Sequence, residues 1–179
     1  MKNKYTISIF TEDRIGLLNR ITIIFTRRHI NIQSITAGES EVKGVYRYTI
    51  VVEVDLEQMK KLIGQIEKQV EVLKAFYHLD EEIISKEIAL YKISASALSK
   101  AEELTDLLHL NNAKIATATS EYLAIEKTGN VTEILSLFEK LEPYGMLEFA
   151  RSGKVAITKP MKTLNTYLKE LENNNQFKN

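Results

Sequence analysis

The sequence contains no cysteine and no excess charge of either sign, and both absences exclude classes of function. Without cysteine there is no disulfide, no thiolate metal ligand and no cysteine nucleophile. Lys plus Arg equals Asp plus Glu at 24 each, so no net field draws the chain to nucleic acid or anionic lipid. The first residues, MKNKYTISIFTED, lack the apolar core of a signal peptide, and no run is long enough to span a bilayer. These absences predict a cytoplasmic protein.

Catalytic and metal-binding motifs are missing as well. The three histidines, His29, His78 and His109, fall in different predicted elements and have no metal-ligand spacing. No phosphate-binding glycine loop, dinucleotide glycine pattern or G-x-S-x-G elbow occurs. The sequence therefore disfavours an enzyme that acts alone, and it gives no support for a metal or a cofactor in this chain.

The residues that are present follow a pattern in which hydrophobic spacing changes between that of a strand and that of a helix. The expected elements are, in order, a strand at 4–10, a helix at 17–28, strands at 30–37 and 45–54, a helix at 56–66 and a strand at 70–77. Asp55 is placed to cap the second helix. The first part of the chain therefore reads βαββαβ.

The same order repeats after a charged break, HLDEE, at residues 78–82. The expected elements are a strand at 88–95, a helix capped by Ser99 and ending at Leu110, strands at 114–119 and 122–126, a helix at 134–141 and a strand at 146–149. The predicted fold class is α+β, with two ferredoxin-like units whose antiparallel sheets carry helices on one face. The opposite face and an edge strand of such a unit need cover, which favours dimers or partners.

These elements predict three segments. Residues 4–80 form the first domain and residues 84–158 the related second domain. Residues 159–179 form a C-terminal helix followed by a polar tail, because the segment after Pro160 has a short amphipathic pattern before it becomes polar. No chemistry is assigned to this last segment.

The stretch TEDRIGLLNR, at 11–20, is the strongest candidate for a binding site. A helix start has unpaired N–H groups near Gly16 that can receive a carboxylate, and Asp13 with Asn31 could bind an ammonium group. If these three residues converge, they suit an amino acid. Three structural alternatives stand beside this interpretation: Asp13 only caps the helix, Gly16 only lets helix and sheet approach, and Asn31 only occupies a left-handed turn position.

Five segments carry a resemblance to a known family. EDRIGLLNR and FTRRHINIQSIT (25–36) resemble the first ACT domain of the small regulatory subunit of acetolactate synthase, also called acetohydroxyacid synthase. YRYTI (46–50), KEIALYKI (86–93) and FARSG (149–153) are similar to later segments of the same family. A free-standing ACT-type amino-acid sensor, which is the main alternative, would account only for the first of them.

The resemblance implies a non-catalytic subunit that activates a thiamine-diphosphate-dependent large subunit and transmits inhibition by valine or another branched-chain amino acid. Thiamine diphosphate, magnesium and FAD are then expected in the large subunit and not in this chain. In the family the effector lies between the first ACT domains of two subunits, so the resemblance also implies a homodimer. The effector residues that it implies here are Asp13, Gly16, Leu17, Leu18 and Asn31.

Two positions depart from the family pattern. The family commonly has asparagine at the position of Asp13 and alanine at that of Leu17, which puts sensitivity to valine in question. Four further matches are interpreted as serving either the fold or the contact with the large subunit, namely Arg47, Arg151, Ser152 and Gly153. A solvated strand face for Arg47 and a tight turn for the RSG segment are the simpler readings.

Overall fold

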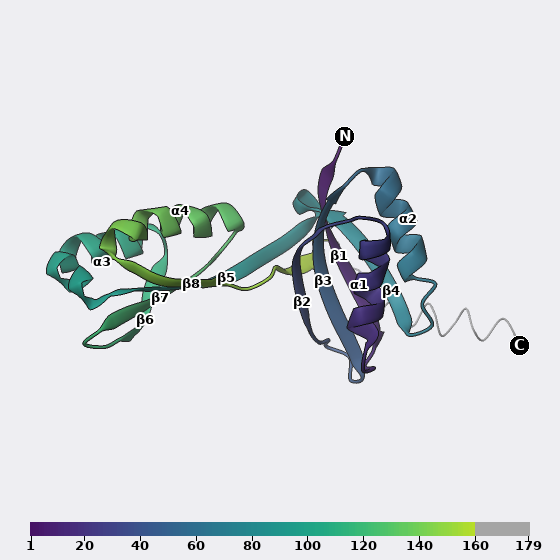
Figure 1. Cartoon of the computed structure of the whole chain (residues 1–179), viewed down its shortest axis with the longest axis horizontal. Helices are drawn as coiled ribbons and strands as arrows, with labels where there is room; N and C mark the ends of the chain where they lie inside the picture. Colours follow the sequence, from purple (N-terminus) through teal and green to yellow (C-terminus); the bar gives the residue numbers. More distant parts are fainter. Residues whose placement is uncertain (160–179) are drawn as a thin grey trace, which may run out of the picture. The chain divides into compact units, whose positions relative to one another are not determined.

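The computed structural model describes residues 1–159, so the predicted helix and tail at 159–179 lie outside the described residues except for Lys159. The described chain divides into two compact units (Figure 1). The first comprises residues 1–84 together with the segment from Ala156 onward, and the second comprises residues 85–155. The predicted second domain ends at residue 158, whereas the second unit ends three residues earlier.

The first unit is a four-stranded antiparallel sheet with two helices. Its elements are β1 (Asn3–Glu12), α1 (Leu17–Arg27), β2 (Ile32–Glu39), β3 (Val45–Val54), α2 (Leu56–Ile66) and β4 (Val72–Leu79). The strand order is β2-β3-β1-β4, and every pairing is antiparallel. The strand β1 is therefore central, and β2 and β4 lie at the two edges.

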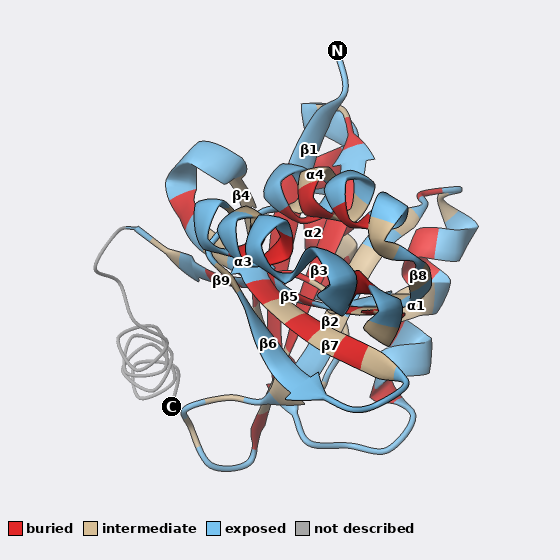
Figure 2. Ribbon diagram, turned by 90° about the vertical axis from the view of Figure 1, so that its left-hand side faces the viewer, coloured by how far each residue is buried: buried red, intermediate tan, exposed pale blue. Residues whose placement is uncertain are grey.

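The core of this unit forms because the apolar stripes of both helices pack on one face of the sheet. That face presents alternate residues of β1, such as Tyr5, Ile7 and Ile9, which are all buried. Figure 2 colours the buried stretches of the strands and helices red. The buried helix residues in the same cluster are Leu17, Ile21, Ile24 and Phe25 from α1 and Met59, Leu62, Ile63 and Ile66 from α2. Asp55 caps α2 as predicted, since its side chain accepts a hydrogen bond from the Gln58 N–H at 2.8 Å.

The second unit repeats this topology. Its elements are β5 (Ile83–Ser94), α3 (Ala101–Leu110), β6 (Ala113–Ala118), β7 (Tyr122–Gly129), α4 (Val131–Leu141) and β8 (Met146–Arg151). The order β6-β7-β5-β8 corresponds strand by strand to β2-β3-β1-β4, and a short strand β9 (Val155–Thr158) also pairs with β5. The predicted pair of βαββαβ units is confirmed.

The core of the second unit is built around Tyr91 of β5, whose side chain is fully buried. Its hydroxyl donates a hydrogen bond of 2.8 Å to the carbonyl of Ile134 in α4. The helix α4 begins with a reciprocal cap, in which Asn130 accepts from the Glu133 N–H and Glu133 accepts from the Asn130 N–H. Strand and helix are therefore joined by polar as well as apolar contacts.

Three local predictions were wrong. Ser99 does not cap α3, because it belongs to a 3-10 helix, η2 (Ala95–Lys100), and donates to the Ser96 carbonyl. The charged break predicted at 78–82 is only partly a linker. His78 and Leu79 complete β4, and the next three residues form the 3-10 helix η1 (Asp80–Glu82). The strand β9 was not predicted. None of the helices in the described residues is long and apolar enough to cross a membrane.

Candidate functional site

The candidate site begins at the turn between β1 and α1, which Gly16 makes possible. Gly16 has φ +81°, a left-handed conformation, and a Cβ placed there would meet nothing within 4 Å. Close approach of helix and sheet is therefore not the reason for glycine, and that alternative is wrong. The backbone turn itself favours glycine, because other L residues adopt this φ only with strain.

The first turn of α1 has no side-chain cap. Gly16 occupies the N-cap position, and no side chain hydrogen-bonds to the helix there. Asp13 is exposed, and its backbone N–H donates to the Gly44 carbonyl at 3.3 Å. The interpretation of Asp13 as the helix cap is therefore wrong. The uncapped start of α1 has a partial positive charge, and the exposed carboxylate of Asp13 nearby has a negative one. These two charges could pair with the carboxylate and the ammonium group of an amino acid.

A depression of about 740 Å³ lies beside this turn. It is lined by Glu12, Asp13, Arg14, Ile15, Arg20, Val70 and Glu71. Two ion pairs cross it: Arg14 contacts Glu12 at 3.1 Å, and Arg20 contacts Glu71 at 2.7 Å. Hydrogen bonds from a backbone amide and from Arg20 hold the pKa of Glu71 below its ordinary value. The sequence pattern missed Val70 and Glu71 because they arrive from the turn before β4, about fifty residues away.

The two leucines of the turn point in different directions. The side chain of Leu17 is fully buried in the core, whereas Leu18 is 41% exposed. Of these two leucines, only Leu18 therefore presents its side chain to solvent. The bulk of Leu17, at the position where the resemblance led us to expect alanine, fills the core and does not narrow an exposed pocket.

Asn31 lies at the opposite end of the unit. Ile32 pairs with Val52, which pairs with Tyr5 near the start of β1, whereas Gly16 follows the end of β1. The 11-residue helix α1, about 16 Å long, separates the two positions. The expectation that Asp13, Gly16 and Asn31 converge within one unit is therefore wrong.

Arg47 and the RSG segment are held by contacts within their own units. Arg47 donates to Ser8 Oγ and to the Ala156 carbonyl, and its guanidinium lies 5.2 Å from the centre of the Phe10 ring. Burial lowers the pKa of Arg47, while Glu41 acts against this shift. The reading of Arg47 as a solvated strand residue is therefore wrong.

In the second unit Arg151 pairs with buried Glu87 at 3.2 Å. Ser152 makes two hydrogen bonds of 2.9 Å to the backbone of Ile88. Its N–H donates to the Ile88 carbonyl, and its Oγ accepts from the Ile88 N–H. These contacts fasten the end of β8 to β5. They give the ARSG segment a structural role, to which Gly153 contributes its carbonyl as an acceptor for Ser152 Oγ.

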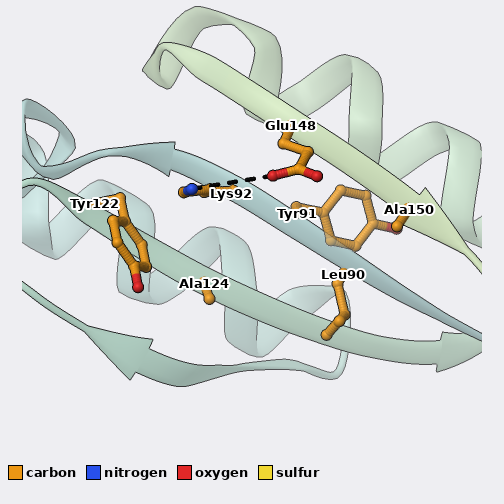
Figure 3. Close-up of a pocket in the computed structure, with 7 residues that line it drawn as sticks. All are labelled: Leu90, Tyr91, Lys92, Tyr122, Ala124, Glu148 and Ala150. Carbon is orange, nitrogen blue, oxygen red and sulfur yellow. Dashed lines mark ion pairs between the residues drawn. The ribbon is translucent and has the colours of Figure 1, made fainter.

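A shallower depression of about 230 Å³ lies on the second sheet (Figure 3). Its lining is mostly apolar, with Leu90, Ala124 and Ala150 beside Lys92. Lys92 lies 3.9 Å from Glu148 and 4.6 Å from the centre of the Tyr122 ring. The carboxylate in this lining belongs to Glu148. Across residues 1–159, His, Asp and Glu side chains do not gather into a group that could hold a metal ion.

Comparisons with known proteins agree across both units. A family model described as the small subunit of acetolactate synthase matches residues 86–160, and an ACT domain model matches residues 5–71. The acetolactate synthase small subunit of Bacillus subtilis is 38% identical over 157 residues, which cover 87% of this chain and 91% of that protein. The chain belongs to the family of acetolactate synthase small subunits.

Two further relatives extend this result. The small subunit from Mycolicibacterium smegmatis is 35% identical over 155 residues, again 87% of this chain and 91% of that protein. The crystal structure of the small subunit from Thermotoga maritima superposes with a TM-score of 0.81 at 29% identity, covering 89% of this chain and 99% of that one. The acetolactate synthase small-subunit fold is thus shared over nearly all of the described residues.

Proposed function

We propose that this chain activates the thiamine-diphosphate-dependent large subunit of acetolactate synthase and makes it sensitive to valine or another branched-chain amino acid. The observation that carries the proposal is the similarity to small subunits of this enzyme over 87% of the chain. The chain itself would contribute no catalytic group. Thiamine diphosphate, magnesium and FAD would all be held by the large subunit.

The turn before α1 has the chemistry to receive the effector. The uncapped first turn of α1 offers backbone N–H groups and the positive end of a helix dipole to the effector carboxylate. The exposed carboxylate of Asp13 would attract the ammonium group, and Leu18 would contact the aliphatic side chain. Asp13 carries a charge that the family's asparagine lacks, so the balance between ammonium attraction and carboxylate repulsion would decide the affinity.

A homodimer would complete the site that one unit leaves open. β2 lies at the edge of the first sheet, and a two-fold axis that pairs two β2 edges antiparallel brings Asn31 of one copy to the Gly16 end of the other. Exposed apolar side chains on this side of the unit support such an interface, namely Ile15, Leu18, Ile23 and Ile35. The effector would then bridge two copies, and its inhibition would depend on the dimer.

The direct test is acetolactate formation by the cognate large subunit, with and without this chain, during titration with valine, leucine and isoleucine. Stimulation by the chain together with inhibition by one amino acid is the expected result. Stimulation without inhibition would keep the regulatory subunit and reject the effector site. Absence of both stimulation and binding would reject the whole proposal in favour of a free-standing sensor.

Two substitutions separate the effector site from activation. Asn31→Ala and Gly16→Asp are each expected to raise the half-inhibitory amino-acid concentration at least tenfold while stimulation is retained. Gly64→Asp is the matched control, because Gly64 lies on α2 with open space around it. Unchanged inhibition in both site variants would contradict the assignment of these residues.

A further inference from the structure

The sheet face opposite the helices is exposed to solvent in the second unit and buried in the first. In β5 of the second unit, Ile88 and Leu90 on the face opposite the helices are 46% and 49% exposed. In β1 of the first unit, the residues of that face are Thr6, Ser8 and Phe10, which are 1%, 4% and 5% exposed. Because the topology is the same, the first sheet has a cover on this face that its two helices do not supply.

The end of the described chain provides part of that cover. Ala156 of β9 is buried, and its carbonyl accepts a hydrogen bond from Arg47, which lies on this face beside Ser8. Lys159 is then held at η1, since its N–H donates to the Glu82 carbonyl at 3.0 Å and its Nζ to the Glu81 carbonyl at 2.7 Å. Lys159, the last described residue, is therefore held at the border of the covered face.

The face also contains polar atoms that lack partners. Among the described residues, Thr6 Oγ1, Arg47 Nε and His78 Nε2 are buried without a hydrogen bond. Thr6 and His78 are directly paired across β1 and β4, and Arg47 contacts Ser8, two residues along β1 from Thr6. Buried polar groups in native proteins are nearly always paired, so this cluster predicts an occupant that carries hydrogen-bonding groups. Arg47 presents a guanidinium to this cluster, with which a carboxylate of the occupant can pair, and Glu41 and Glu82 are the acidic residues that interact with Arg47 and His78.

Apolar side chains lie beside this polar cluster. Phe10 and Val45 are buried on this side of the sheet, and Val42, Leu73 and Phe76 pack against them. The sequence after Pro160 matches such a surface, because Leu164, Tyr167, Leu168 and Leu171 have the spacing of one helical stripe. Glu170 and Glu172 flank the stripe and supply carboxylates.

We propose that residues 160–179 dock on the open face of the first unit's sheet, with the stripe of leucines and Tyr167 against Phe10 and Phe76. A carboxylate of the same segment pairs with Arg47, whereas only uncharged groups of the segment reach Thr6 and His78, so docking buries His78 in its neutral form. Attachment at Lys159 gives this segment a high effective concentration at the face, which a second copy or another protein lacks. The proposal is independent of the effector site.

Titration of the histidines by NMR tests this docking in the full-length chain. Burial lowers the pKa of His78, with Glu82 opposing the shift and Arg47 adding to it. Leu168→Asp is expected to undock the segment, hydrate His78 and move its pKa toward the ordinary histidine value. An unchanged far-UV circular dichroism spectrum of the variant would exclude general unfolding.

Thr166→Asp is the matched control, since it adds the same charge on the opposite side of the stripe. It should leave His78 unchanged. A second measurement uses a chain that ends at Lys159, to which a peptide of residues 160–179 is added. The peptide should reverse the change at His78, and its Leu168→Asp version should bind at least tenfold more weakly.

Two outcomes would overturn the proposal. In the first, His78 titrates identically in the full-length chain, in the Leu168→Asp variant and in the chain that ends at Lys159. In the second, the shortened chain does not bind the peptide, and His78 keeps its lowered pKa only at protein concentrations where sedimentation shows self-association. That result would assign the cover to a second copy of the chain.

Discussion

Replacement of glycine by alanine is expected to have opposite effects on the free energy of unfolding at Gly64 and at Gly145. Gly64 lies inside α2, where an added Cβ would meet nothing within 4 Å, whereas Gly145 has φ +80° and its Cβ would lie 3.2 Å from Ser94 Cβ. We expect Gly64→Ala to stabilise the protein by about 0.5–1 kcal/mol, because alanine favours the helix. Gly145→Ala should destabilise it by about 1–2 kcal/mol, since L residues avoid this backbone conformation. Urea unfolding of both variants measures the difference, and a gain at Gly145 would contradict the argument.

Tyr91 links stability to alkaline pH. Burial raises the pKa of its hydroxyl to about 12, against which Arg151 acts weakly. The neutral form is therefore favoured in the folded state, and the stabilisation is complete below the unfolded pKa of about 10 and lost as the pH rises from there toward 12. Tyr91→Phe should remove this alkaline loss. At neutral pH it should cost about 0.5–1.5 kcal/mol, because the hydrogen bond to Ile134 disappears.

Unfolding of the wild type and of Tyr91→Phe at pH 8 and pH 11 checks both parts of this prediction. The difference between the two proteins isolates Tyr91 from other groups that titrate in the same range. A stability difference that does not depend on pH would show that Tyr91 titrates in the folded protein as it does in the unfolded chain.

At the scale of the element, the cap of α4 is expected to matter more than its other polar residues. Asn130→Ala removes an acceptor for the Glu133 N–H and disrupts a reciprocal pair, which should cost about 1 kcal/mol. Thr132→Ala is the control, because Thr132 is exposed in the same helical turn and alanine favours a helix slightly more. Thermal unfolding should show a lower midpoint only for the Asn130 variant.

Elements with a strong local pattern were predictable, and those that depend on distant partners were not. The helix α2 begins where the Asp55 cap predicts and ends where its apolar stripe predicts, because both signals are local. Ser99 has the residue type of a cap, yet Ser94 begins a 3-10 helix five residues earlier and accepts from the Ser96 N–H. The strand β9 exists through its pairing with β5, about seventy residues away in sequence, which hydrophobic spacing over four residues cannot indicate.

At the scale of the whole molecule, the residues of the candidate site could be proposed from the sequence, whereas their arrangement in space could not. The sequence identifies Gly16 and Asn31 as unusual residues next to regular elements. It does not indicate that α1 holds them apart, because this separation follows from the register of β2 against β3. A site that needs both residues therefore predicts two copies of the chain.

The proposed dimer can be tested on the exposed apolar side of α1. Ile23 is 37% exposed and does not belong to the buried core cluster of the first unit, so a glutamate there can keep its carboxylate in water in the folded unit but places charge at an interface formed along α1 and β2. We expect Ile23→Glu to raise the dissociation constant of the dimer at least tenfold in sedimentation equilibrium, and to weaken inhibition by the amino acid in parallel. Leu135→Glu is the control, since Leu135 is 44% exposed against 37% for Ile23 and lies on α4 in the second unit. Equal dissociation constants in the two variants would place the interface elsewhere, and the two-copy effector site would then lose its geometric basis.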